Sequence, residues 1–241
     1  MEARTSIIKK RLSPINRIIA VASGKGGVGK SLVASSLALN LADKGKKVGL
    51  LDLDLYGPSA HIILDIHDVF PQEENGIIPP TIHDIHFMSI VYFTEDKPAP
   101  FRGIDITNII IELLAITQWG DLDYLIIDLP PGIGEETLDI IRFITRCEFL
   151  VITTPSKVAL AAVEKLLKIL KEMNLPIIGV IENMVMQPTP LIKQALKDYN
   201  IHYLGQLPYD QTIEDSLGTP KKLLHTPFST NLQEIMTTFI Q

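Results

Sequence analysis

The sequence contains very little cysteine: Cys147 is the only one among 241 residues. A lone cysteine forms no disulfide within its chain and supplies no thiolate cluster by itself. We therefore expect a reducing, cytoplasmic location. Long apolar runs are also lacking, because no stretch of about 18 apolar residues occurs, so we expect no membrane-spanning segment. Residues 1–12 lack the apolar core of a signal peptide.

Positive charge is in deficit. The chain has 22 Lys and Arg against 28 Asp and Glu, for a net charge of −6. General binding to nucleic acid needs a basic footprint that neutralises phosphates, so we expect no nucleic-acid partner. Residues 228–241 have periodic apolar side chains but no Lys or Arg, which predicts a helix packed on the body rather than a membrane anchor.

Short apolar runs alternate with helical patterns along most of the chain. Residues 17–23 have the pattern of a buried strand, 30–44 have helical spacing, and 47–53 form the next apolar run, which together make a βαβ unit. The predicted fold class is therefore α/β, a single doubly wound, mostly parallel sheet flanked by helices, with its ligand at the carboxyl ends of the strands. Further strands are expected at 123–128, 149–153, 176–182 and 202–207, and further helices at 135–147, 157–173 and 188–199.

Two segments fall outside this alternation. Residues 1–14 predict an N-terminal helical extension, with Ile7, Ile8 and Leu12 on one side of the helix. Residues 57–100 hold four of the six histidines and predict an insertion on the rim of the sheet, with one strand near 86–91. We treat residues 1–241 as a single domain, because no repeat, low-complexity tract or linker divides them.

The loop after the first strand carries the strongest chemical signal. Residues 24–31 satisfy the pattern G-x-x-x-x-G-K-S/T between a strand and a helix. The glycines let the backbone wrap a phosphate chain, Lys30 supplies charge to the β and γ phosphates, and the Ser31 hydroxyl ligates Mg²⁺. We therefore expect slow, Mg²⁺-dependent hydrolysis of ATP to ADP. The residues assigned to the nucleotide are Gly24, Lys25, Gly26, Gly27, Val28, Gly29, Lys30, Ser31 and Leu32.

Three carboxylates are expected at the same edge of the sheet. Asp52 and Asp54 close the second strand, where alternation places both on one side, and Asp128 ends another apolar strand. From there one carboxylate can hold Mg²⁺ and another can orient the attacking water. Solvation of a strand end is the alternative for the Asp52–Asp54 pair. The Pro-Pro-Gly sequence at 130–132 is typical of a switch loop that senses the γ-phosphate.

These motifs resemble a known family. Residues 25–31, Lys-Gly-Gly-Val-Gly-Lys-Ser, are similar to the deviant Walker A sequence of the MinD/ParA ATPases, in which a second lysine lies early in the loop. Five further segments resemble the Mrp branch of that superfamily. They are Asp-Leu-Asp-Leu-Tyr-Gly-Pro-Ser at 52–59, Phe-Arg-Gly at 101–103, Trp-Gly-Asp-Leu-Asp-Tyr at 119–124, Ile-Asp-Leu-Pro-Pro-Gly at 127–132 and Gly-Val-Ile-Glu-Asn-Met at 179–184.

The resemblance implies roles for individual residues. Lys25 matches the lysine that crosses a dimer interface to the partner's phosphates, so the working state is a homodimer that sandwiches ATP. Asp54 matches the residue that positions the attacking water, and Asn183 matches the reader of adenine. By the same resemblance, the catalytic residues are Lys25, Lys30 and Asp54, the Mg²⁺ side is formed by Ser31, Asp52 and Asp128, and Pro208 and Tyr209 belong to the loop that closes over the base.

One feature of the Mrp branch is missing. Mrp-type iron–sulfur cluster carriers have a Cys-x-x-Cys pair shortly after the Glu-Asn-Met segment, and here residues 185–190 read Val-Met-Gln-Pro-Thr-Pro. Because Cys147 is expected in the core at the end of a helix, the number of ligands excludes cluster binding in the usual way. An iron–sulfur carrier is therefore the disfavoured alternative, as is a ParA/MinD-like positioning ATPase.

The archaeal hydrogenase-maturation proteins of the HypB type, built on this scaffold, resemble the chain in length and in lacking the cysteine pair. That resemblance implies ATP-dependent support of nickel insertion into NiFe hydrogenase. The partner would be a HypA-type metallochaperone docked through residues 3–12, although packing on the chain's own body also accounts for this helix. Four rim histidines suit Ni²⁺ by chemistry, but no Cys or carboxylate set completes a site, which favours surface histidines. They are His61, His67, His83 and His86.

Overall fold

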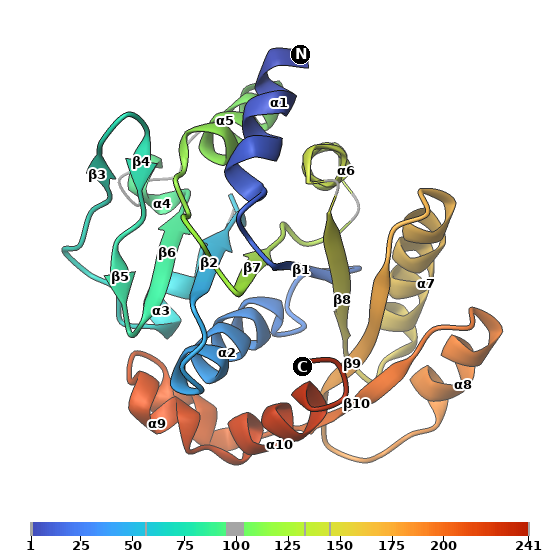
Figure 1. The fold of residues 1–241 in the computed structure, drawn as a ribbon. Helices are drawn as coiled ribbons and strands as arrows, with labels where there is room; N and C mark the ends of the chain where they lie inside the picture. The colour runs from blue at the N-terminus through green and yellow to red at the C-terminus, as the bar shows by residue number, and fades with distance from the viewer. Residues whose placement is uncertain (1, 56, 95–103, 133, 145, 241) are drawn as a thin grey trace.

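One sheet organises the computed structural model, which describes residues 2–55, 57–94, 104–132, 134–144 and 146–240. Its eight strands lie in the order β10-β9-β8-β1-β7-β2-β6-β5 (Figure 1). All neighbouring pairs are parallel except β5 and β6, which form an antiparallel hairpin at one edge. The strands are β1 (Arg17–Ser23), β2 (Val48–Asp52), β5 (Thr81–Ile82), β6 (Ile85–Ser89), β7 (Tyr124–Asp128), β8 (Cys147–Thr153), β9 (Ile177–Val185) and β10 (Tyr203–Pro208).

Apolar side chains project from both faces of this sheet, as expected for a parallel sheet that is covered on both sides. In β1, Ile18 and Ala20 enter one buried cluster while Ile19 and Val21 enter the other. The same alternation runs through β2 and β7, so the central strands are buried along their whole length. The two faces therefore carry separate cores, and each needs its own layer of helices.

Helices cover each face of the sheet (Figure 1). One core contains side chains of α1, α5, α6, α7 and α8, and the other contains those of α2, α3, α9 and α10. The helices are α1 (Glu2–Leu12), α2 (Lys30–Asp43), α3 (Ala60–Ile63), α4 (Val91–Thr94), α5 (Ile104–Ile116), α6 (Glu135–Phe143), α7 (Lys157–Glu172), α8 (Leu191–Asp198), the 3-10 helix η1 (Gln211–Ser216), α9 (Pro220–Leu224) and α10 (Pro227–Met236).

The predicted doubly wound, mostly parallel sheet is confirmed, with two local differences. The helix expected over 135–147 ends at Phe143, and Cys147 instead begins β8, where it pairs in register with Ile18. Pairing with the central strand outweighs the helical spacing of this segment. The cysteine is buried, as expected, with 2% of its surface exposed.

The rim segment, residues 57–100, contains more strands than the single one expected near 86–91. β6 pairs in parallel with β2, and β5 extends the sheet by one further strand. A separate hairpin, β3 (Gln72–Glu73) and β4 (Ile77–Ile78), lies outside the main sheet. Residues 95–100 of the expected insertion, and the Phe-Arg-Gly motif at 101–103, lie outside the described residues.

The N-terminal helix α1 packs on α5 and continues the core of that face. Ile8 and Leu12 are buried there, whereas Ile7, expected on the same side, is 47% exposed. The guanidinium of Arg11 donates to the carbonyls of Ala115 and Asn75, which ties the end of α1 to α5 and to the β3–β4 hairpin. The helix α1 therefore packs on other parts of the same chain.

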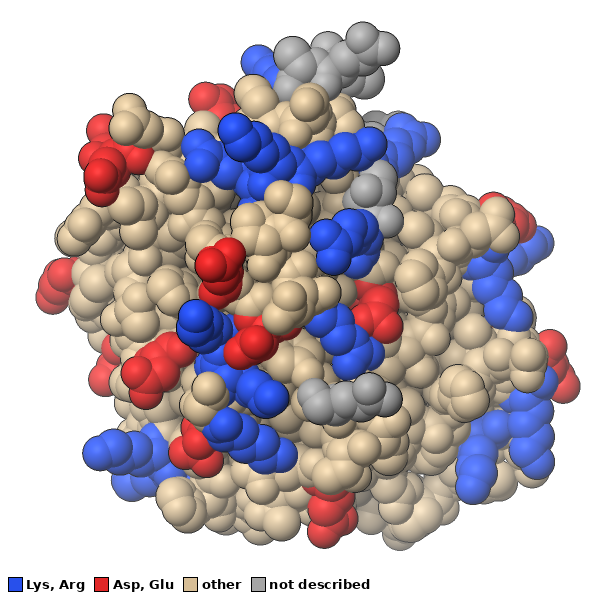
Figure 2. All heavy atoms as spheres, in the orientation of Figure 1, with Lys and Arg blue, Asp and Glu red and all other residues tan. Residues whose placement is uncertain are grey.

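Charge of both signs lies on the face seen in Figure 2, with Lys and Arg side chains gathered over α1 at the top. α1 supplies the basic residues Lys9, Lys10 and Arg11 in its last turn. The net negative charge of the chain is therefore not spread evenly over its surface. Among the described helices, none has the length and apolar character that crossing a bilayer requires.

A buried polar contact joins α2 to the C-terminal helix and gives a stability prediction. Asn40 of α2 is buried and exchanges hydrogen bonds with the Ser229 hydroxyl of α10, at 3.0 and 3.2 Å. Asn40→Ala leaves Ser229 without these partners, so we expect a loss of about 1–3 kcal/mol in the free energy of unfolding, measured by urea denaturation. The control Asn231→Ala removes an exposed amide of α10 and is expected to change stability by less than about 0.5 kcal/mol. Equal losses in the two variants would contradict this account.

Candidate nucleotide-binding site

The loop between β1 and α2 takes a shape that glycine makes possible. Gly27 and Gly29 have φ values of 76° and 80°, in the left-handed region that side chains disfavour. Gly29 is also the N-cap of α2 and provides no side-chain cap for it. The N–H groups of the first turn of α2 are therefore available to an anionic ligand, and the helix dipole favours negative charge at this end.

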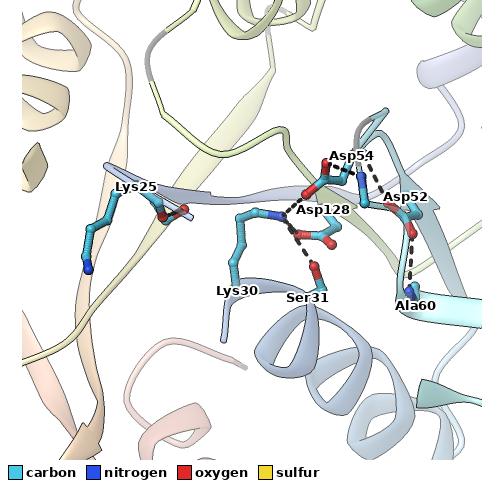
Figure 3. Close-up of polar contacts among 9 residues, drawn as sticks. Lys25, Lys30, Ser31, Asp52, Asp54, Ala60 and Asp128 are labelled. Carbon is cyan, nitrogen blue, oxygen red and sulfur yellow. Dashed lines mark hydrogen bonds and ion pairs between the residues drawn. The ribbon is translucent and has the colours of Figure 1, made fainter. Parts of the chain in front are cut away.

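Lys30 lies at the centre of the polar contacts beneath this loop (Figure 3). Its ammonium forms an ion pair with Asp128 and lies 3.9 Å from an Asp54 carboxylate oxygen. The same ammonium donates to the Ser31 hydroxyl at 3.4 Å. Four of the residues expected at the phosphate and metal site, from α2, β7 and the end of β2, therefore lie together.

Asp52 holds the neighbouring loop in place. One of its carboxylate oxygens accepts from the backbone N–H of Asp54 at 3.0 Å, and the other accepts from that of Ala60 at 3.2 Å. The Asp54 carboxylate in turn accepts from the N–H of Gly57 at 3.2 Å. These bonds fold the chain after β2 back on itself and direct Asp54 toward Lys30.

Negative charge is in excess at the floor of the site. Asp52 and Asp128 are fully buried and face each other in register on β2 and β7, with Lys30 as the cation beside them. Burial and the neighbouring Asp128 carboxylate raise the pKa of Asp52 to about 7. Burial also raises the pKa of Asp128, against the opposing effect of the Lys30 ammonium. One oxygen of Asp128 has no hydrogen-bond partner among the described residues, which leaves it open to a further cation.

A cavity of about 520 Å³ opens above this floor. The phosphate loop and Asp54 form one wall, and a second wall comes from the end of β10 and the segment after it, including Pro208 and Tyr209. Asn183 of β9 lies between them, and its amide nitrogen donates to the backbone carbonyl of Val28 at 2.9 Å. The expected residues that line the cavity are Lys25, Gly26, Gly27, Gly29, Lys30, Ser31, Leu32, Asp54, Asn183, Pro208 and Tyr209.

Lys25 lines the cavity without joining the Lys30 group, and four other expected residues do not line the cavity: Gly24, Val28, Asp52 and Asp128. The Lys25 side chain extends away from the Lys30 group (Figure 3), and no hydrogen bond or ion pair to it occurs among the described residues. The Val28 side chain is buried in the core, so only its backbone carbonyl faces Asn183. Gly24 packs against α7, where a Cβ atom would approach the Ala162 backbone to 2.4 Å. Asp52 and Asp128 lie behind Lys30 rather than in the cavity wall.

On the base side, the cavity position of Met184 and the contacts of Asp210 were not predicted from the sequence. Asp210 caps η1 through the N–H and hydroxyl of Thr212, and its other oxygen accepts from the N–H of Phe228 at 3.2 Å. These three bonds lower the pKa of Asp210. Met184 lines the cavity in a left-handed conformation with φ of 58°. The Asp-Gln-Thr sequence at 210–212 is an N-cap signal that predicts the turn, whereas no local pattern predicts the contact with Phe228 or the conformation of Met184.

The four rim histidines make local contacts in the described part of the chain. Across the described ranges, no three His, Cys, Asp or Glu side chains converge on a metal site. His83 hydrogen-bonds the Leu64 carbonyl, His86 contacts the Thr81 hydroxyl, and His67 pairs with Asp65. His61 is buried in α3. These histidines therefore belong to local structure.

Comparison with known proteins shows the family. Residues 14–241 match the model of the ParA family described as NUBPL iron-transfer P-loop NTPase. An iron–sulfur cluster carrier protein of Aquifex aeolicus is 37% identical over 90% of the chain and 65% of its own length. One from Methanocaldococcus jannaschii is 35% identical over 97% of the chain and 87% of its own length. The chain thus spans slightly under two thirds of the Aquifex relative.

Solved structures agree with this match. A nucleotide-binding protein of Archaeoglobus fulgidus in complex with ADP superposes with a TM-score of 0.79 at 30% identity, over 94% of this chain and 95% of that one. The cell division ATPase MinD of Pyrococcus furiosus superposes with a TM-score of 0.71, over 92% of this chain and 98% of that one. At 21% identity, the second likeness shows the fold alone.

These findings correct two expectations. Assignment to nickel insertion with a HypA-type partner is wrong, because the relatives are named iron–sulfur cluster carrier proteins and the family model describes iron transfer. That assignment rested on a missing cysteine pair, and an absence distinguishes subgroups less well than the motifs that are present. The chain belongs to the ParA family of P-loop NTPases, in the group described as NUBPL iron-transfer NTPases.

Proposed function

We propose that the chain is a slow, Mg²⁺-dependent ATPase that works as a dimerising switch in iron–sulfur cluster transfer. The observation that carries this proposal is the buried group of Lys30, Asp54 and Asp128 beneath a glycine loop, in a chain of the iron-transfer family. The Archaeoglobus fulgidus neighbour bound to ADP supports a nucleotide in the same loop.

The charges at the floor favour Mg-ATP over free ATP. Asp54, Asp128 and a partly protonated Asp52 face one ammonium, so triphosphate alone would add negative charge beside carboxyl groups that burial already makes costly to ionise. Carboxylate, hydroxyl and phosphate oxygens are ligands that Mg²⁺ prefers. In this proposal Ser31 and Asp128 would hold the ion, with Asp52 behind them, and the bound ion would neutralise phosphate charge. Lys30 would then exchange its carboxylate partners for phosphate oxygens.

Hydrolysis needs an oriented water and one more cation. Asp54 lies 8% exposed at the cavity edge, its backbone held by Asp52, so its carboxylate is placed to orient water toward the γ-phosphate. Lys25 extends away from the phosphate side of its own chain (Figure 3). This direction supports a role for Lys25 at the phosphates of a second copy, where its charge would stabilise the transition state.

The base pocket has a built-in preference for adenine. One of the two N–H groups of the Asn183 amide donates to the Val28 carbonyl, which fixes the orientation of the amide, and we propose that its amide oxygen accepts a hydrogen bond from the base. An acceptor at this point suits the exocyclic amino group of adenine and repels the carbonyl oxygen of guanine. Pro208 and Tyr209 supply the opposite wall of the cavity, where the ring would lie.

The cluster ligands must come from outside this sequence. Burial raises the pKa of the Cys147 thiol to about 12, so it is neither exposed nor a thiolate at neutral pH. Iron–sulfur clusters are commonly held by four cysteine thiolates, and even a homodimer offers two buried thiols. We therefore propose that the nucleotide cycle acts on a cluster bound by the cysteines of a partner protein.

The two lysines of the loop are expected to fail in different ways. Lys30→Ala removes the cation beneath the phosphates and should lower ATP affinity at least about 100-fold, measured by calorimetry. Lys25→Ala should leave affinity within about threefold while lowering turnover at least about tenfold and weakening ATP-dependent dimerisation, followed by light scattering. Equal losses of affinity in the two variants would refute this division of roles.

Asn183 gives a test of base selection. Wild-type protein is expected to bind ATP at least about tenfold more tightly than GTP, since one base hydrogen bond is replaced by a repulsion. Asn183→Ala should weaken ATP and bring the two affinities within about threefold of each other in competition experiments. A preference for ATP that survives this change would show that another group reads the base.

Anaerobic reconstitution tests the source of the cluster ligands. Purified protein incubated with iron, sulfide and reductant should hold well under one cluster per dimer by iron and sulfide analysis, while still hydrolysing ATP. In the presence of an iron–sulfur scaffold protein carrying a cluster, ATP should speed cluster transfer to an apo-ferredoxin, and Lys30→Ala should abolish that effect. A stoichiometric cluster on the chain alone, or transfer indifferent to ATP, would contradict the proposal.

A further inference from the structure

Helix α7 presents an exposed basic stripe beside the nucleotide loop. Its buried side consists of Ala159, Val163, Leu166, Leu167 and Leu170, which pack on the sheet. The residues on the opposite side recur at helical spacing and are exposed. They are Lys157, Val158, Ala161, Lys165 and Lys168, and we call this set the α7 stripe.

The charge of the stripe contrasts with that of the chain. It carries three lysines and no acid, whereas the whole chain has a net charge of −6. Glu164 is half-buried at its margin, and Glu172 follows in the last turn. Within the described residues none of the three lysines forms an ion pair. The stripe is therefore a positive surface on an acidic protein, with Glu164 and Glu172 as the acids of the same helix.

An apolar side chain lies among these charges. Val158 is 72% exposed, among the most exposed large apolar side chains of the described residues. A shallow hollow joins it to the loop and is lined by Gly24, Lys157, Val158, Ala161, Ala162 and Lys165. A partner that fills this hollow would cover Val158 and neutralise two of the lysines.

The nucleotide loop forms one edge of that hollow. Gly24 begins the phosphate loop, and a Cβ atom there would lie 2.4 Å from the carbonyl carbon of Ala162 and 2.7 Å from the nitrogen of Val163. The loop and the α7 backbone therefore touch without an intervening side chain. A shift of the loop at Gly24 must move against α7, so the shape of the hollow is sensitive to what the loop binds.

We propose that the α7 stripe docks an acidic, partly apolar segment of a partner protein, and that the nucleotide changes the affinity of this contact through Gly24. The nucleotide response rests on the proposed ATP site, while the docking surface stands independently of it. The positive charge of the stripe favours an acidic partner segment, because opposite charges attract across an interface. The exposed apolar side chain of Val158 favours a protein partner over a polynucleotide. A membrane is disfavoured because a surface-lying helix needs a broad apolar face, and α7 already buries its own in the core.

The test uses the full chain and a defined probe, a fluorescein-labelled synthetic peptide of sixteen residues rich in Glu with two Leu. Binding is followed by anisotropy at about 0.15 M ionic strength, where charges beyond about 8 Å are screened. The stripe variant is Lys157→Glu with Lys165→Glu. The matched control is Lys44→Glu with Lys46→Glu, which reverses two exposed lysines after α2. ATP hydrolysis and oligomeric state are measured for each protein.

The wild-type protein and the control variant should bind the peptide with similar affinity. The stripe variant should bind it at least tenfold more weakly, and its rate of ATP hydrolysis should be unchanged. Val158→Ser, or Ser in place of both Leu in the peptide, should weaken binding about threefold. Adding ATP to wild type should change the affinity by at least threefold, and Lys30→Ala should abolish that change.

An equal loss of peptide affinity in the control variant would show that only the net charge of the protein matters, and it would overturn the proposal. Tighter binding of the stripe to phosphatidylglycerol vesicles or single-stranded DNA than to the peptide would assign another class of partner and overturn it too. Loss of ATP-dependent dimers in the stripe variant with unchanged peptide binding would assign the stripe to a contact between copies. Absence of peptide binding in a protein that hydrolyses ATP would refute the docking surface and leave the proposed ATPase intact.

Discussion

The buried ion pair between Lys30 and Asp128 joins the phosphate loop, the first helix after it and the central strands of the sheet. A buried pair recovers little net stability, because removing both charges from water costs about as much as their attraction returns. Its value is that Lys30 is held, desolvated and oriented, beneath a loop of free N–H groups. A phosphate that enters the loop would meet a cation already in position, and Asp128 would then be free to face a metal ion.

The register of the sheet makes this arrangement possible. β7 lies between β1 and β2, so Asp128 faces Val21 on one side and Asp52 on the other. Asp52 then anchors the chain after β2, which directs Asp54 to the same ammonium. Three carboxylates from two distant segments of the chain are thus gathered at one strand edge. The excess negative charge they create requires a cation, and this requirement links nucleotide binding to Mg²⁺.

Much of the fold and of the candidate site could be predicted from the sequence, because strand ends and glycine loops have strong local sequence patterns. The alternation of apolar residues placed Asp52, Asp54 and Asp128 on one edge, and the loop pattern placed Lys30 there too. Contacts between distant segments were not predictable: Asp210 reaches Phe228, and Gly24 touches α7, without any local pattern. The end of α6 was missed for the same reason, since pairing with β1 decides it.

The missing cysteine pair misled the assignment of function. The chain belongs to the iron-transfer family, whereas its one cysteine, Cys147, is a core residue of β8. A nucleotide switch can act on a cluster that it does not itself hold, provided that a partner docks where the loop can move it. Placing the α7 stripe against Gly24 offers such a route within the fold.

We expect the charges around Lys30 to make Mg²⁺ a condition of nucleotide binding. Titration calorimetry of ATP into the protein, with Mg²⁺ and then with Mg²⁺ removed by chelation, measures this directly. The account predicts that affinity falls at least about tenfold without Mg²⁺, and that replacing Asp128 with Asn reduces this difference. Equal affinity of the wild-type protein for ATP in both conditions would contradict it.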